Sequence, residues 1–565
     1  MGTRYLYRTD NIRNRYPLLF ISTRAFHFTV VVSIFILIFH INNGSTLSLS
    51  VYSVFATTEN NSDSLVINQG VASGDVTDDS AVVWSRSNRE AQMHVEYDTN
   101  SNFSQPRSTD ATTIGNQTTD YTSHVKLEEL SPDTLYYYRV WFSTPPLSQA
   151  NKTTSLASDI LAGSFRTSPS ASLPSNKPIS FIFAADLGGQ KHCRQVDKGG
   201  YYIFEKMKEL SPDFFIANGD MIYAADKCPV QGPSDDWKNI PGNFSGVADP
   251  EINWTNTEQV RDTYLKHWQY NRADPYLQSF LQNTSTYSQW DDHEVINDFG
   301  ALWPYWNSFN KDREGYSNIV NEGRKVFFDY SPIDRNLDQN NRIYRSFNWG
   351  PNLDLFILDG RSYRSPNSMA DTPENNKTML GTEQLQWLEQ GLMNSSAIWK
   401  VISSDVPISV PTGANASILG RDGWANGNET NFSSETGFER ELQQLLRFLD
   451  DSNIDNVVFV TTDVHFPANI LYDLDANNDG DKLIFHELIS GPLSAFRFGT
   501  PGGAPIPKLD NTFNPKILYE EGGIFNFGHV KVQKNPEDTL VHLKAQVVDD
   551  NGFTRPNSTL DLEPR

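Results

Sequence analysis

The pattern of apolar and polar positions changes once along the chain, near residue 170. From Leu65 to about Thr167, short runs alternate apolar and polar residues or are rich in β-branched and aromatic ones, and clusters of turn-forming residues separate them. This spacing predicts an all-β sandwich. The strands expected within it are residues 80–84, 93–97, 124–127 and 135–141.

Beyond Ile179, short apolar runs end at polar residues and alternate with stretches of helical spacing, which predicts an α/β domain. The strands expected there are residues 180–185, 214–217, 353–358, 400–403 and 457–460, and the helices are 202–209, 383–393 and 439–449. We therefore divide the chain into a signal or anchor segment with a polar tether (1–63), a β-sandwich domain (64–168), a Ser/Pro linker (169–178) and an α/β domain (179–565).

The N-terminal segment has the pattern of an export signal. Arginines dominate the charges of the first twenty-five residues, and residues 26–41 are almost wholly apolar. The apolar run is shorter than the roughly 20 residues of a comfortable spanning helix, and the nearest small-residue cleavage site, residues 54–56, is distant. A cleaved signal peptide and a transmembrane anchor both stay open. Repeated Asn-x-Ser/Thr sequons fit a secreted or surface glycoprotein.

Composition narrows the class of protein. A chain of 565 residues exceeds one hydrophobic core, and 12 Trp, 23 Tyr and 34 Phe indicate a folded chain. A formal charge of -23 argues against specific nucleic-acid binding by phosphate neutralisation. We expect a monomer. The two cysteines, Cys193 and Cys228, lack zinc-ligand spacing, and either a disulfide or two buried thiols is compatible with the sequence.

Polar side chains with metal-binding chemistry follow four of the apolar runs. An isolated aspartate after a strand is more often a helix cap or turn former than a ligand. Here, however, carboxylate, imidazole and phenol groups recur at successive strand ends, where open α/β sheets place their ligand sites. These donors suit hard or borderline metal ions. The residues concerned are Asp186, Asp220, Tyr223, Asp292, His293, Asp463 and His465.

Five motifs, in their order along the chain, give the sequence a recognisable resemblance. They are residues 70–86 (GVASGD and VVWSR), 219–224 (GDMIYA), 290–295 (WDDHEV), 358–363 (LDGRSY) and 463–465 (DVH). The chain resembles the PhoD-like alkaline phosphatase and phosphodiesterase family over about residues 65–550. That family belongs to the calcineurin-like metallophosphoesterases and is related to the purple acid phosphatases. The WDDHEV run is the most specific of the motifs.

The resemblance implies the fold in more detail. It predicts a four-layer metallophosphoesterase β-sandwich flanked by helices, which makes residues 179–565 the catalytic domain. A small all-β domain of fibronectin or immunoglobulin type precedes it. Residues 226–260, rich in Pro, Gly and Asn, are expected to form a lid over the site.

The resemblance also implies Fe(III) held by a cysteine and by the Asp and Tyr of the GDxxY motif, with Ca²⁺ or another divalent metal nearby. Here the position of the family's cysteine is Gly188. Asp186, which is similar to the DxG aspartate of purple acid phosphatases, is our candidate replacement, with Cys193 as the alternative. The predicted metal ligands are Asp186, Asp220, Tyr223, Asp292, Asp463 and His465.

The expected reaction is hydrolysis. Metal ions bind the phosphate oxygens and lower the pKa of a bound water, which gives hydroxide for in-line attack on phosphorus. His293 is the candidate catalytic residue, either stabilising the transferring phosphoryl group or protonating the leaving oxygen, and a purely structural role is the alternative. Asn297 and Arg361 are weaker candidates for phosphate binding, with structural pairing the alternative.

We therefore expect an exported, metal-dependent hydrolase of small phosphate esters, an alkaline phosphatase or phosphodiesterase. Two alternatives stay open: a phospholipase D-like phosphodiesterase, and a non-catalytic cell-surface protein built on a phosphatase fold. Membrane anchoring through the N-terminal segment is possible in any of these cases. A zinc metalloprotease is not supported, because the second histidine of its HExxH motif is replaced by Asn297.

Overall fold

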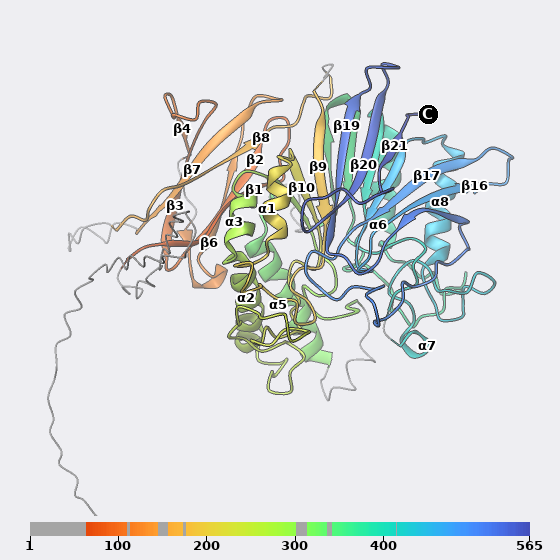
Figure 1. Cartoon of the computed structure of the whole chain (residues 1–565), viewed down its shortest axis with the longest axis horizontal. Helices are drawn as coiled ribbons and strands as arrows, with labels where there is room; N and C mark the ends of the chain where they lie inside the picture. Colours follow the sequence, from red (N-terminus) through yellow and green to blue (C-terminus); the bar gives the residue numbers. More distant parts are fainter. Residues whose placement is uncertain are drawn as a thin grey trace, which may run out of the picture. The chain divides into compact units, whose positions relative to one another are not determined.

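Figure 1 shows the computed structural model of the chain. It describes residues 64–109, 114–144, 156–172, 177–300, 313–335, 342–413 and 415–565. Residues 61–565 form one compact unit. Within the described residues, no helix is both long enough and apolar enough to cross a membrane. The predicted signal or anchor segment, with its apolar run, lies outside the described residues.

Two large sheets form the centre of the molecule. The first has the strand order β21-β20-β19-β9-β10-β11-β1-β2-β6, and the second has the order β12-β13-β14-β15-β17-β16-β18. The strands of the first sheet are β21 (Leu560–Leu562), β20 (Val541–Asp549), β19 (Asn526–Lys534), β9 (Ile179–Ala184), β10 (Phe214–Asn218), β11 (Ser285–Gln289), β1 (Ile67–Gly74), β2 (Ala81–Ser87) and β6 (Thr122–Leu127). Those of the second are β12 (Arg345–Trp349), β13 (Leu353–Ile357), β14 (Trp399–Ser403), β15 (Val457–Thr461), β17 (Leu483–Ile489), β16 (Ala468–Leu474) and β18 (Pro515–Glu520).

Successive side chains of a strand point to opposite faces of its sheet and therefore pack into different hydrophobic cores. In β9, Phe181 and Phe183 pack between the two sheets, whereas Ile182 and Ala184 face the other way, into a core shared with helices. The second sheet does the same, because Leu355 packs between the sheets and Phe356 packs against helices. Helix, sheet, sheet and helix thus form four layers, which confirms the predicted fold class.

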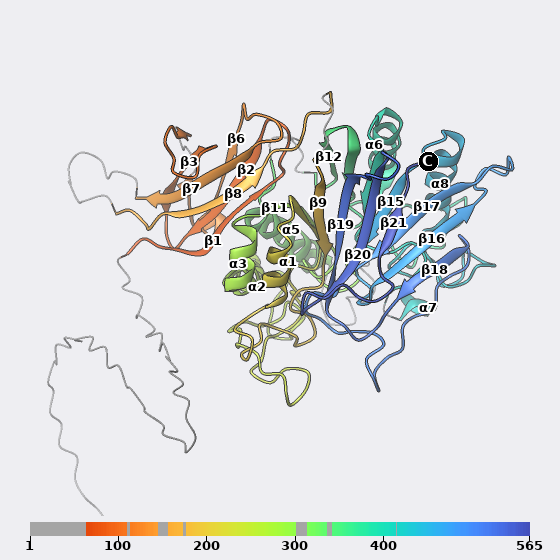
Figure 2. The same ribbon diagram turned by 45° about the horizontal axis from the view of Figure 1, so that its top comes forward.

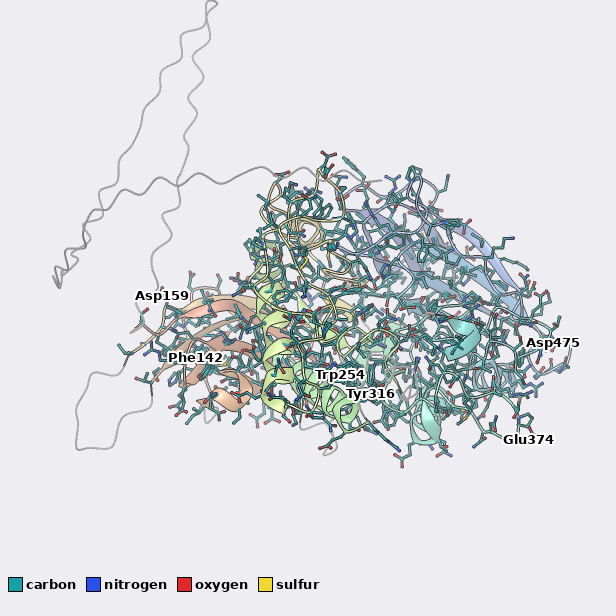
Figure 3. All side chains as sticks on the ribbon, turned by 90° about the horizontal axis from the view of Figure 1, so that it is seen from below. Phe142, Asp159, Trp254, Tyr316, Glu374 and Asp475 are labelled. Atoms are coloured by element: carbon teal, nitrogen blue, oxygen red, sulfur yellow. A yellow bond between two sulfur atoms is a disulfide. The ribbon has the colours of Figure 1, made fainter. Side chains whose placement is uncertain are left out.

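Helices cover the outer face of each sheet, as Figures 1 and 2 show. The first sheet carries α1 (Ile203–Glu209), α2 (Thr257–Arg272), α3 (Pro275–Leu281) and α5 (Arg313–Tyr330), and the second carries α6 (Gly381–Asn394) and α8 (Glu439–Asp451). A short helix, α7 (Ala416–Leu419), lies in a long loop. Trp254 and Tyr316, labelled in Figure 3, belong to the core beneath the first helical layer. The three predicted helices correspond to α1, α6 and α8, whereas α2, α3 and α5 were not predicted.

The N-terminal strands form the predicted β-sandwich, but one of its sheets does not end there. A third sheet contains β4 (Arg107–Ser108), β3 (Ala91–Asp98), β7 (Leu135–Ser143) and β8 (Leu161–Arg166), with β5 (Ile114–Gly115) paired to β3. Its apolar residues pack against those of β1, β2 and β6. Strand β1 also pairs in parallel with β11, where Gly74 lies opposite Thr286. The sandwich and the α/β domain therefore share a sheet, which the sequence pattern did not indicate.

The junction at Gly74 generates a stability prediction. A Cβ atom on Gly74 would lie 2.5 Å from the carbonyl oxygens of both Thr286 and Pro332. Because both neighbours are backbone, Gly74→Ala must displace β1 from β11, and we expect it to lower the free energy of unfolding by about 1–3 kcal/mol. Chemical denaturation measures the change. Gly423→Ala, where the nearest atom lies 3.4 Å away, is the control, and equal losses in the two variants would contradict the prediction.

Candidate metal centre

The predicted metal-binding side chains come from two sheets whose parallel strands end at the same edge. Strands β9, β10 and β11 run parallel and are followed by Asp186, Asp220 and Asp292. In the facing sheet, β15 is followed by Asp463 and His465. Backbone strain accompanies several of these positions, because φ is positive at Asp186 (65°), Asp220 (50°), Asp463 (72°) and His465 (56°). Such conformations persist where the surrounding structure enforces them.

Three of the side chains meet at one end of the site. The Tyr223 hydroxyl lies 3.0 Å from His465 Nε2 and 3.4 Å from Asp186 Oδ1. His465 Nε2 is 3.5 Å from the same Asp186 oxygen. His465 Nδ1 lies 2.7 Å from the carbonyl oxygen of Phe496, which fixes that nitrogen as the donor and leaves Nε2 with its lone pair facing the other two groups. A cation at this point would find phenol, carboxylate and imidazole donors together.

A second group of donors adjoins the first. Atoms of Asp220, Asp292 and His293 lie within 4.8 Å of one another, as do atoms of Asp291, Asp292 and Asp463. The His293 ring stacks on the Tyr223 ring with centroids 3.9 Å apart, which joins the two groups. Because Asp292 belongs to both sets, the two sets form one continuous cluster.

Unpartnered buried atoms test whether the cluster fits metal ions. Asp186 Oδ2, Asp220 Oδ2, Asp292 Oδ1 and His293 Nδ1 are buried and have no hydrogen-bond partner among the described residues. Leaving such atoms unpaired is costly, and coordination of a cation would satisfy them. The donor set and its vacant atoms therefore fit the hard or borderline metals expected from the sequence.

The electrostatics of the cluster favour a cation as well. Burial, followed by repulsion from Asp291 and Asp292, raises the pKa of Asp186 well above its ordinary value. Burial and the neighbouring carboxylates raise the pKa values of Asp220 and Asp463 in the same direction. Burial lowers the pKa of His293 to about 4 and that of His465 to about 3, so both imidazoles are neutral at pH 7 and can donate lone pairs.

Glu294 holds the loops that carry the ligands. Its carboxylate accepts backbone N–H groups from Asp220 at 2.9 Å, Met221 at 2.7 Å and Asp291 at 2.8 Å. These donors belong to the loop after β10 and to the loop after β11. One fully buried side chain therefore fixes the position of the Asp220 loop relative to Asp291 and Asp292.

Arg361 lies within the acidic cluster. Its side chain is fully buried, and its guanidinium contacts Asp291 at 2.5 Å and Asp422 at 2.7 Å. Asp405 lies 3.4 Å away. The geometry thus favours the structural pairing over the phosphate contact that the sequence also allowed. Asn297 is only half-buried, and its role in phosphate binding stays a prediction.

The position of the family's cysteine has no room for a longer side chain. Gly188 has a φ of +86°, and a Cβ atom on it would lie 2.5 Å from the Tyr201 hydroxyl. The alternative thiolate is also absent, because Cys193 forms a disulfide with Cys228, whose Cα atoms are 5.8 Å apart. Of the two candidate replacements, only Asp186 offers a free donor atom to the site.

Sequence reasoning missed part of the cluster. Asp291 and Glu294 were recognised only as members of the WDDHEV run, without a role of their own. Asp405 and Asp422 carry no comparable signal, because they lie in loops far along the chain from Arg361 and the other acids they meet.

Comparison with known proteins agrees with this geometry. A model described as PhoD-like phosphatase matches residues 188–543, more than half of the chain. The chain belongs to the PhoD-like phosphatase family. A second model, the N-terminal domain of PhoD-like phosphatases, matches residues 54–169. Alkaline phosphatase D of Bacillus subtilis (strain 168) is 26% identical over 522 residues, which cover 87% of this chain and 80% of that protein.

Solved structures show the same fold. A structure of PhoD matches with a TM-score of 0.64 and 18% identity, covering 89% of this chain and 93% of that one. A purple acid phosphatase from yellow lupin (Lupinus luteus) seeds matches with a TM-score of 0.53 and 14% identity, covering 87% and 73%. As a PhoD-like phosphatase, the chain is a hydrolase of phosphate esters, and metal dependence is consistent with its family.

The contacts of Glu294 generate a prediction about the metal centre. In Glu294→Gln, the amide cannot accept all three backbone N–H groups. We therefore expect it to lower the free energy of unfolding by about 1–3 kcal/mol, and to lower both bound metal and turnover. Denaturation, elemental analysis and phosphate-ester hydrolysis measure the three effects.

Glu441→Gln is the matched control. Glu441 is also buried and accepts backbone N–H groups from Met379 and Leu380, but it lies on α8, in the layer of helices outside the second sheet. We expect it to lose stability and keep its metal. Normal metal content and turnover in Glu294→Gln would contradict a positioning role for Glu294.

Proposed function

We propose that the chain is an exported, metal-dependent phosphatase that acts on small phosphate esters at the cluster described above. The observation that carries the proposal is the set of buried donor atoms without partners on Asp186, Asp220, Asp292 and His293. Bound metal ions would supply Lewis acidity there, which neutralises phosphate oxygens and makes water more acidic. Fe(III) with Ca²⁺ or another divalent metal is our proposed set of ions.

The proposed ligands divide between the two ends of the cluster. Asp186 and Tyr223 would hold the trivalent ion, and His465, whose Nε2 lies within 3.5 Å of both donor atoms, would complete the cluster beside them. Asp220 is the proposed bridging ligand, and Asp292 and Asp463 complete the second site. Burial and the adjacent carboxylates raise the pKa of Tyr223 well above 10, so its hydroxyl ionises there only when a cation is close.

His293 is the proposed catalytic residue of the cluster. Burial keeps its imidazole neutral, and its Nδ1 atom is unpartnered while Nε2 lies 3.9 Å from Asp292 Oδ1. A neutral imidazole has one N–H and one lone pair, so His293 can donate a hydrogen bond to a phosphate oxygen, or can serve through its lone pair as an additional ligand beside Asp220 and Asp292. Arg361 offsets the negative charge of Asp291 and Asp422.

The location and the domain boundaries are also proposals. The Cys193–Cys228 disulfide supports export, because disulfides persist mainly in oxidising compartments. The segment 226–256 follows the metal-binding loop without helices or strands, and this disulfide ties its start to residue 193, which supports a lid. We also keep residues 64–168, 169–178 and 179–565 as sandwich, linker and catalytic domain, with a monomer as the proposed assembly.

Hydrolysis of chromogenic substrates tests the function. We expect the purified chain to hydrolyse a phosphate monoester or diester, and chelation to abolish the activity because the carboxylates alone repel phosphate. The ratio of monoester, diester and phospholipid rates measures the substrate class and separates the phospholipase D-like alternative. Absence of metal-dependent turnover on all three would contradict the proposal.

The replacement of cysteine by Asp186 has its own test. Asp186→Asn and Tyr223→Phe each remove one anionic donor, so we expect iron per chain, measured by elemental analysis of protein purified without added metal, to fall in both. The control is Asp475→Asn, at the exposed β16–β17 turn labelled in Figure 3, which should keep full iron. Full iron in Asp186→Asn would refute the replacement.

A further inference from the structure

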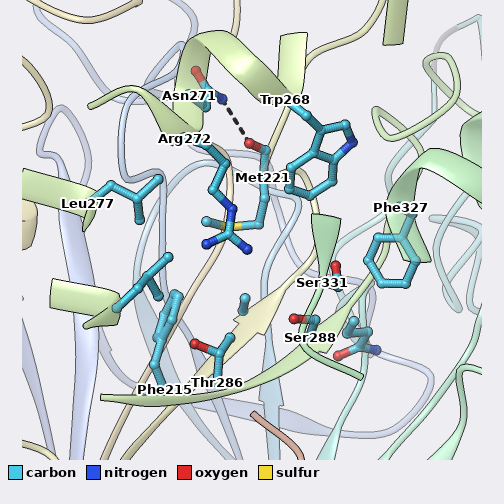
Figure 4. Close-up of a pocket in the computed structure, with 13 residues that line it drawn as sticks. Phe215, Met221, Trp268, Asn271, Arg272, Leu277, Thr286, Ser288, Phe327 and Ser331 are labelled. Atoms are coloured by element: carbon cyan, nitrogen blue, oxygen red, sulfur yellow. Dashed lines mark hydrogen bonds between the residues drawn. The ribbon is translucent and has the colours of Figure 1, made fainter. Parts of the chain in front are cut away.

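A separate buried cavity lies behind the loop that follows β10, between the first sheet and its helices. It has a volume of about 30 Å³ and receives side chains from β10, β11, α2, α3 and α5. Figure 4 shows Arg272 reaching into its middle, with Thr286 and Ser288 below. Apolar side chains, among them Phe215 and Phe327, form much of its wall. All of the lining residues are buried.

The charge of Arg272 has no acidic partner in the described part of the chain. Arg272 is 7% exposed. Its guanidinium lies 4.5 Å from the centroid of the Trp84 ring, and one Nη atom donates a hydrogen bond to the carbonyl oxygen of Tyr330. Burial lowers its pKa to about 10, and no carboxylate opposes this effect, so the group is still protonated at pH 7. By contrast, the buried Arg345 is paired with Asp75 at 2.7 Å.

Two more polar groups on the cavity wall lack partners. Trp268 Nε1 and Thr286 Oγ1 are buried and make no hydrogen bond with any described residue. The indole can only donate a hydrogen bond, and the hydroxyl can donate one. An isolated buried charge is expensive unless it is paired. Figure 4 shows the Trp268 nitrogen turned away from Arg272, so the cavity offers an occupant the positive charge of Arg272 and the hydroxyl of Thr286, which suit a small and negatively charged ligand.

We propose that this cavity binds one small monovalent inorganic anion, such as chloride, through Arg272 and Thr286. A halide matches the single positive charge and tolerates the apolar walls. Phosphate is a poorer match, since it carries close to two negative charges and four oxygens that need donors. The anion site also adjoins the loop that follows β10, because the neighbouring Asn271 donates to the carbonyl oxygen of Met221 at 2.8 Å.

Bromide substitution tests the site directly. Crystals of the full, metal-loaded chain grown in sodium bromide should show an anomalous bromine peak in contact with Arg272. In solution, Tm should rise and saturate with bromide relative to gluconate at equal ionic strength, because a ligand that binds only the folded state stabilises it. An ordered water in place of bromine, or equal Tm values in the two salts, would overturn the proposal.

Paired variants separate this cavity from other halide sites. Thr286→Val removes one donor without changing the charge, and we expect bromide affinity about tenfold lower, as for a lost hydrogen bond to an ion. Thr286→Ser keeps the hydroxyl and should bind as the parent does. A bromide effect that is unchanged in Thr286→Val would belong to the metal centre or the surface and would refute the assignment. Arg272→Gln should abolish the effect if it folds, and the Thr286 pair decides the matter if it does not.

Discussion

The carboxylate of Glu294 joins two loops that leave different strands of one sheet, and the metal centre depends on this connection. Backbone N–H groups at positions 220, 221 and 291 all point at it. Since the residues next to these groups are proposed metal ligands, the same carboxylate that satisfies the backbone also sets the spacing of the proposed donors. The facing sheet contributes Asp463 and His465 across the gap, and the apolar core between the sheets keeps that gap constant.

The buried carboxylates of the site fall into two groups that differ in their partners. The first group consists of the proposed ligands Asp186, Asp220, Asp292 and Asp463. These carboxylates have unpartnered buried oxygens or raised pKa values, and they can all be ionised together only if cations are bound nearby. The second group is centred on Asp422, which already has cationic partners within the protein, because Arg361 and Arg364 both contact it at 2.7 Å. The histidines beside the first group are neutral at pH 7, so the protein supplies no cation for these proposed ligands, which suit metal ions from solution.

The sequence predicted what depends on local pattern. Strands such as 180–185 and 457–460 and helices such as 439–449 have clear periodicity, and the proposed metal-binding residues follow the strands directly. Helix α2 was missed because its buried face is built from Tyr264, His267 and Trp268 rather than from aliphatic residues. The pairing of Arg361 with Asp405 and Asp422 depends on how distant loops meet, which no local pattern encodes.

The shared sheet has a consequence for the handling of the chain. Strand β1 pairs with one edge of β11. The α/β part produced without residues 64–168 would therefore expose that edge unpaired. It would also expose the ring of Tyr330, whose centroid lies 5.9 Å from that of the Trp84 ring. Exposed edges of this kind promote self-association. The β-sandwich is therefore a structural part of the enzyme, and the two parts have to be expressed and engineered together.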